Sequence, residues 1–142
     1  RPIPVIAFHG TGDPINPIGG GGPAYWHSSV RDAARDWAVF NGCRDGPDTL
    51  ETEDHHTKQL VYSGCSDGAE VRLFVTEHMG HVWPGLRFEF ARGCGWRELD
   101  LIASKHIYSF FRAHPLPLAF EPRAREALYA PHWLPGEVDG DD

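Results

Sequence analysis

The sequence has no long hydrophobic run and little positive charge, and each absence excludes classes of protein. No apolar stretch approaches the ~20 residues that span a bilayer, and no signal-peptide pattern is visible. Lys and Arg number 13 against 20 Asp and Glu, so the net charge is −7. Because phosphate binding requires clustered Lys and Arg, we expect no nucleic-acid partner. For the same reason we expect no attraction to an anionic membrane.

Cysteine is also scarce, with three residues at Cys43, Cys65 and Cys94. An odd number does not make a closed disulfide framework, so the alternatives include one disulfide bridge with one free thiol. No C-x-x-C spacing is present, which argues against a structural zinc site. His78 and His81 lie three positions apart, but no Cys or carboxylate completes a metal-ligand set around them. We therefore expect neither a metal nor another cofactor.

What is present fits one folded domain followed by a tail. The 142 residues are 41% hydrophobic and 12% aromatic, which is enough for a hydrophobic core. The chain starts at Arg1 without Met and leads directly into a strand pattern, so we expect a piece of a longer protein. Residues 1–115 are expected to fold. Residues 116–142 are Pro-rich and acidic at their end, and they are expected to be a partly disordered tail.

Apolar periodicity indicates an alternation of strands and helices. The predicted elements are a strand at 4–8, a helix at 28–41, a strand pair at 59–63 and 71–76, and a helix at 99–113. The polar residues 44–58 are interpreted as a surface excursion, and a short helix is possible at 123–129. This order is typical of the end of an open α/β sheet.

Two Gly-rich loops each carry one polar residue that hydrolysis could use. Asp13 follows the first strand, and His81 follows the strand at 71–76. If the two strands are close in one sheet, the carboxylate can accept a hydrogen bond from the imidazole Nδ1–H. Nε2 is then left free to accept a proton from a serine hydroxyl. The residue types alone stay ambiguous, because an Asp here is more often a turn former and a loop His more often a surface or core residue.

Several segments resemble the C-terminal half of one enzyme family, in the same order and at similar spacing. That family is the polyhydroxybutyrate depolymerase and feruloyl esterase branch of the α/β-hydrolases. The most specific segments are H-G-T-G-D-P at 9–14 and G-H-V-W-P-G at 80–85. The supporting segments are W-A-V-F-N-G-C at 37–43, Y-S-G-C at 62–65 and A-S-K-H-I-Y-S-F-F-R-A-H-P at 103–115.

The resemblance implies a fold, a site and a substrate class. The implied fold is the C-terminal part of an α/β-hydrolase open, mostly parallel sheet with flanking helices. Asp13 matches the acid of a catalytic triad, His81 matches the base, and Trp83 matches a wall of the substrate pocket. Cys43 and Cys65 match cysteines that form a disulfide. The implied substrate is a polyester or a hydroxycinnamoyl ester, and the implied location is extracellular or periplasmic.

The sequence departs from this family at the nucleophile. The family places a Ser on a G-x-S-x-G turn ahead of the acid, whereas only one strand precedes Asp13 here. The segment G-C-S-D-G at 64–68 fits that pattern, but it lies between acid and base and precedes a strand, so Ser66 is interpreted as part of a hairpin turn.

Three functions follow from these observations. The first is a fragment of a serine carboxylic-ester hydrolase, acting on a polyhydroxyalkanoate or feruloyl-type ester. It would supply the acid and base and require the missing N-terminal half as its partner. The second is a catalytically silent fragment or binding module that needs a partner chain. The third is an unrelated metal-binding or carbohydrate-binding domain.

Overall fold

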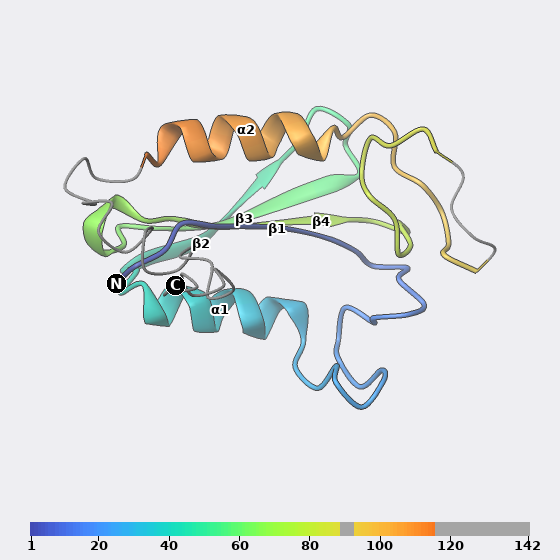
Figure 1. Ribbon diagram of the computed structural model, residues 1–142, viewed down its shortest axis with the longest axis horizontal. Helices are drawn as coiled ribbons and strands as arrows, with labels where there is room; N and C mark the ends of the chain where they lie inside the picture. The colour runs from blue at the N-terminus through green and yellow to red at the C-terminus, as the bar shows by residue number, and fades with distance from the viewer. Residues whose placement is uncertain (89–92, 116–142) are drawn as a thin grey trace, which may run out of the picture.

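The computed structural model describes residues 1–88 and 93–115. Four strands form one sheet in the order β1-β4-β3-β2. The strands are β1 (Val5–Gly10), β2 (Asp45–Glu51), β3 (Thr57–Ser63) and β4 (Val71–Thr76). The helices α1 (Val30–Phe40) and α2 (Ala103–Ala113) lie on opposite faces of this sheet (Figure 1). The predicted tail, residues 116–142, lies outside the described residues.

The predicted fold class is wrong. The chain does not form the C-terminal part of an α/β-hydrolase sheet that is open, mostly parallel and flanked by helices. The described residues form a small β-rich domain, a four-stranded mixed sheet with two helices. Only β1 and β4 are parallel, while β3 is antiparallel to both β2 and β4. The reason is that β2, β3 and β4 follow one another through short turns, which join antiparallel neighbours.

The strand β2 was not predicted, because it lacks the apolar pattern that marks a buried strand. All seven of its residues are exposed, so neither face carries an alternating apolar set. Its backbone nevertheless pairs with β3 from Glu51–Lys58 to Asp45–Ser63, with an irregularity between Asp45 and Asp48. Polar side chains on such an edge strand discourage pairing with other molecules. Residues 44–58 are therefore mostly sheet edge and turn instead of a loose excursion.

One hydrophobic core lies between α1 and the sheet. The helix begins after Ser29, whose hydroxyl accepts a hydrogen bond from the Asp32 N–H at 3.0 Å. Its small buried residues allow the helix to approach the strands closely. The buried residues of this core are Ala34, Ala38, Leu60, Tyr62, Val71, Leu73 and Val75. Each Val or Leu buried in this way stabilises the fold by about 1.5–3 kcal/mol.

The opposite face of the sheet is covered by α2 through aromatic contacts. The ring of Phe74 stacks on Phe8 with centroids 4.6 Å apart, and His106 packs on Phe74 at 4.8 Å. Arg72 lies over the ring of Phe110 at 5.7 Å. The helix starts four residues later than the predicted range 99–113. The face of the helix that lies against the sheet includes its buried residues Ala103 and Phe110, whereas Phe111 is 49% exposed.

The disulfide expected from the resemblance is present. Cys43 is bonded to Cys65, and Cys94 is a free cysteine. The bond joins the end of α1 to the turn between β3 and β4, which is the end of the sheet where β4 begins. Closing a loop with a separation of 22 residues stabilises the fold by roughly 3 kcal/mol on the chain-entropy account. A disulfide is compatible with an extracellular or periplasmic location.

We predict that protonation of His106 destabilises the fold. Burial lowers the pKa of His106, the positive charge of Arg72 lowers it further, and Asp54 opposes them only in part. Between this lowered pKa and the ordinary value of 6.5, the unfolded chain binds more protons than the folded chain. The stability contributed by neutral His106 is therefore lost as the pH falls below 6.5.

Urea unfolding at a series of pH values between 8 and 4 measures this effect. His106→Phe keeps an aromatic ring against Phe74 and should lose less stability over this pH range than the wild type. His27→Phe, at an exposed histidine, is the matched control and should follow the wild-type curve. Parallel curves for the wild type and His106→Phe would contradict the prediction.

Candidate functional site

Two loops meet where β1 and β4 end. The parallel register runs from Val5–Val71 to Gly10–Thr76, so both strands end at the same edge of the sheet. The loop that follows β1 carries Asp13, and the loop that follows β4 carries His81. Residues 68 positions apart in the sequence are in this way brought into contact. This edge is also where open sheets commonly place their reactive groups.

Asp13 is fixed by its own loop. One carboxylate oxygen, Oδ1, accepts hydrogen bonds from the backbone N–H groups of Ile15 at 2.9 Å and Asn16 at 2.8 Å. Such a turn, in which an Asp side chain caps the following backbone, is a common local use of this residue. The side chain is only 4% exposed. The turn-forming role and a role toward His81 therefore coexist, because they use different oxygens.

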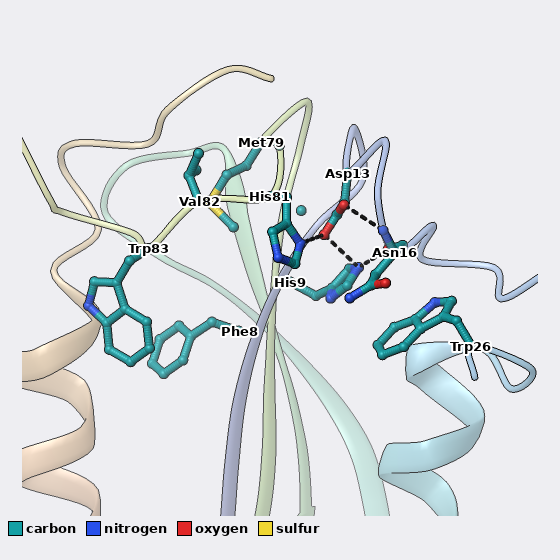
Figure 2. A pocket seen from close by; sticks show the side chains of 11 residues that line it. Phe8, His9, Asp13, Asn16, Trp26, Met79, His81, Val82 and Trp83 are labelled. Atoms are coloured by element: carbon teal, nitrogen blue, oxygen red, sulfur yellow. Dashed lines mark hydrogen bonds and ion pairs between the residues drawn. The ribbon is translucent and has the colours of Figure 1, made fainter. Parts of the chain in front are cut away.

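The second oxygen of Asp13 contacts His81. Asp13 Oδ2 lies 2.8 Å from His81 Nδ1, and Figure 2 shows the ring edge turned toward the carboxylate. Because a carboxylate can only accept, Nδ1 is the protonated nitrogen in this contact. Within the described residues Nε2 makes no hydrogen bond, and the His81 side chain is 46% exposed. The imidazole is thus oriented by a buried carboxylate and open to solvent on its other side.

The charge of Asp13 is stabilised by these hydrogen bonds. Burial alone would raise the pKa of Asp13. The hydrogen bonds from the Asn16 N–H, His81 and the Ile15 N–H outweigh burial, so the pKa lies below its ordinary value of 3.8. The carboxylate is therefore ionised at neutral pH, as a group that stabilises an imidazolium must be.

The close approach of the two loops depends on glycines. A Cβ atom at Gly10 would overlap the carbonyl group of Met79, and one at Gly80 would overlap the carbonyl group of Cys94. Both glycines are buried. The backbone of this region is further held by hydrogen bonds from the Gly80 N–H to Trp96 O and from the His81 N–H to Cys94 O. The loop of residues 77–83 is therefore clamped between β1 and residues 94–96.

A cleft of about 350 Å³ opens beside the Asp13–His81 pair. On one side of His81 it is apolar, formed by Phe8, Val82 and Trp83. Figure 2 shows Trp83 and Phe8 on this side and Trp26 on the other. Trp83 is 46% exposed, its ring lies 6.4 Å from that of Phe8, and it lines the cleft; its role as a wall of a substrate pocket stays a prediction. An apolar cleft with a few convergent polar groups is a typical small-molecule site.

Among the residues that line this cleft, His9, Asn16 and Trp26 were not predicted from the sequence. His9 stands four positions before Asp13 in the same motif, and its Nε2 lies 3.7 Å from Asp13 Oδ2. The signal available was the position of His9 directly after the predicted strand at 4–8, which places it at the edge occupied by the loops. Trp26 stacks on His9 with centroids 5.8 Å apart, and it carried no local signal because it lies in an irregular loop.

No nucleophile lies in the described cleft. Its lining, as far as the structure describes the chain, includes no Ser, Thr or Cys. Ser66 lies in the short 3-10 turn between β3 and β4, at the end of the sheet where β4 begins. The six residues of β4 separate it from His81, a span of roughly 20 Å at the rise of a strand. The interpretation of Ser66 as a turn residue therefore agrees with the structure.

Comparison with protein families, with curated proteins and with solved structures finds no match to this chain. Among residues 1–88 and 93–115, no group of three or more His, Cys, Asp or Glu side chains could hold a metal ion. No helix in the same described part is long and apolar enough to cross a bilayer. The catalytic roles of Asp13 and His81 therefore stay predictions that rest on geometry and resemblance.

We predict that Gly10→Ala separates the two loops. The new methyl group would meet the carbonyl of Met79, so the backbone must shift, at a cost of about 1–3 kcal/mol in the free energy of unfolding. Gly19→Ala is the control, because no atom lies within 4 Å of a Cβ there. Thermal unfolding of both variants measures the difference. Equal stability of the two variants would contradict the proposed close approach.

We predict that Asp13 stabilises the fold at neutral pH and stops doing so in acid. Its pKa is lowered in the folded chain, so its contribution is present above 3.8 and is lost as the pH falls through the lowered pKa. Asp13→Asn should cost about 1–3 kcal/mol at pH 7. The gap to the wild type should shrink between pH 4 and pH 2. Asp36→Asn, at an exposed position, is the control, and a gap that is independent of pH would refute the assignment.

Proposed function

We propose that this chain supplies the acid and the base of a serine carboxylic-ester hydrolase. The observation that carries the proposal is the 2.8 Å contact between Asp13 Oδ2 and His81 Nδ1, with Nε2 open to the cleft. A buried carboxylate that orients a solvent-facing imidazole is the arrangement that activates a hydroxyl for acyl transfer. The resemblance of the two loop motifs to polyester depolymerases and feruloyl esterases supports the same function.

In this mechanism His81 moves the proton and Asp13 holds the ring. His81 Nε2 accepts the proton of a serine hydroxyl while the serine oxygen forms a bond to the ester carbonyl carbon. The resulting imidazolium is stabilised by Asp13 and then gives its proton to the departing alcohol oxygen. Water repeats the sequence on the acyl-enzyme and releases the acid. The serine and the oxyanion donors come from a further polypeptide segment, which is the partner of this chain.

The substrate proposed is an ester with an apolar acyl part, either a hydroxyalkanoate polyester or a hydroxycinnamoyl ester. Phe8, Val82 and Trp83 give the cleft the apolar wall that such acyl groups need. The Cys43–Cys65 disulfide supports a location in the extracellular space or the periplasm, where disulfides persist. No cofactor takes part in this chemistry.

A second function is a catalytically silent fragment or binding module. It is favoured by the absence of Ser, Thr and Cys from the lining of the cleft in the described residues. The two functions make the same prediction for this chain alone, which should not hydrolyse an activated short-chain ester above background. They differ once a nucleophile is present.

The test is ester hydrolysis by the full translation product of the gene, whether or not it extends beyond residues 1–142. If that polypeptide carries a serine on a strand–turn–helix, it should hydrolyse p-nitrophenyl butyrate. Asp13→Asn should then lower kcat by about 10⁴-fold, and His81→Ala should lower it at least as much. Asp36→Asn is the matched control and should stay within about twofold of the wild type, as a remote surface change. Near-normal turnover by Asp13→Asn would exclude the triad.

Ser66→Ala provides a further control. The isolated chain should have no ester turnover. If it does hydrolyse the ester and Ser66→Ala abolishes that turnover, Ser66 is the nucleophile and the proposal is overturned. If the gene encodes no serine on a strand–turn–helix and the chain is inactive, the binding-module function is supported instead.

A further inference from the structure

A second histidine lies near the same carboxylate oxygen of Asp13 that His81 contacts. His9 is the second-last residue of β1, and its side chain is 11% exposed. Its Nε2 lies 2.9 Å from the backbone oxygen of Asn16 and 3.7 Å from Asp13 Oδ2. A backbone carbonyl only accepts hydrogen bonds, so Nε2 carries the proton and donates to Asn16. The partial positive charge of this N–H also lies near the Asp13 carboxylate.

The orientation of the His9 ring is fixed from its other side. Trp26 stacks on it with an angle of 15° between the ring planes and centroids 5.8 Å apart. The indole Nε1–H of Trp26 donates to Pro17 O at 2.7 Å, which ties the stacked ring to the same loop. Figure 2 shows His9 between the Asp13–Asn16 turn and Trp26. The ring is thus held where its Nε2 can donate only toward residues 13–16.

The contacts form a continuous chain from His9 to His81. His9 Nε2–H donates to the backbone oxygen of Asn16. The backbone N–H of Asn16 donates in turn to Asp13 Oδ1. Asp13 Oδ2 then accepts from His81 Nδ1–H. We propose that His9 is a positioning residue, which holds the turn of residues 13–16 so that the Asp13 carboxylate faces His81. Its catalytic meaning rests on the proposed function, but the hydrogen-bond chain itself does not.

The chemistry of histidine explains why this position needs a donor and not only a ring. Without the His9 N–H, the Asn16 carbonyl loses the one donor that the described residues give it. The loop that carries two of the three hydrogen bonds to Asp13 would then be free to shift. The hydrogen bond from the Asn16 N–H is one of those that lower the pKa of Asp13, so that pKa reports the position of the turn.

Two substitutions separate the donor from the ring. His9→Phe keeps a flat ring against Trp26 but cannot donate a hydrogen bond. His9→Gln loses the stacking but places an amide N–H near the position of Nε2. The readouts are the tautomer of His81, from ¹⁵N NMR of the imidazole, and the pKa of Asp13, from ¹³C NMR of its carboxyl group. Both are measured on this chain alone, without any substrate.

We expect His9→Phe to change both readouts and His9→Gln to restore them. In His9→Phe, His81 should change from the Nδ1–H tautomer to a mixture with Nε2–H, and the pKa of Asp13 should rise toward 3.8. Unchanged readouts in folded His9→Phe would overturn the proposal, as would equal losses in both variants. If His9→Phe does not fold, the tautomer of His9 is measured by ¹⁵N NMR in the wild type. The Nε2–H tautomer supports the proposal, and the Nδ1–H tautomer overturns it. Because no ester is involved, failure here is distinct from failure of the hydrolase proposal.

Discussion

β1 and β4 run in the same direction and pair side by side, and the position of every polar group in the cleft follows from this pairing. The strands end together at Gly10 and Thr76, so the loops that follow them start within one strand spacing of each other. Local turn chemistry then carries Asp13 and His81 over the same edge of the sheet. The contact of Gly10 with the backbone of Met79 shows how little space separates the loops. A wider spacing would break the carboxylate–imidazole contact together with the other hydrogen bonds that span both loops, from Gly12 N–H to Met79 O and from His78 N–H to Thr11 Oγ1.

A buried carboxylate is costly unless its oxygens are satisfied, and this cost accounts for the construction of the cleft. Asp13 is 7% exposed and accepts three hydrogen bonds, two from its own turn and one from His81. The two backbone donors are present whatever the state of His81. The carboxylate is therefore held in place by its own turn, independently of the imidazole. A group that only needed to end a strand would not require burial of this kind.

The sequence allowed the local features to be predicted, but not the direction of the strands. Turn residues around Asp13 and His81 stand next to apolar runs, so the two loops and the strands before them could be identified. The edge strand β2 could not, because all of its residues are exposed and its pairing with β3 is a property of the backbone. The resemblance gave the Cys43–Cys65 bond but also suggested a mostly parallel sheet, which is wrong. Short motifs specify loops, whereas sheet direction depends on the lengths of the connections between strands.

The Asp13–His81 contact is complete without the hydroxyl that the proposed function requires. Every hydrogen bond that orients Asp13 and His81 comes from residues of this chain, so the geometry exists before any nucleophile approaches. Approach is possible from the solvent side of His81, beside the apolar wall that Phe8 and Trp83 form. On the proposed function, a segment that completes the site has to supply only a serine and donors for the oxyanion. Because the two side chains are already oriented, the entropy cost of ordering them is part of the free energy of folding and does not add to the barrier of a chemical step.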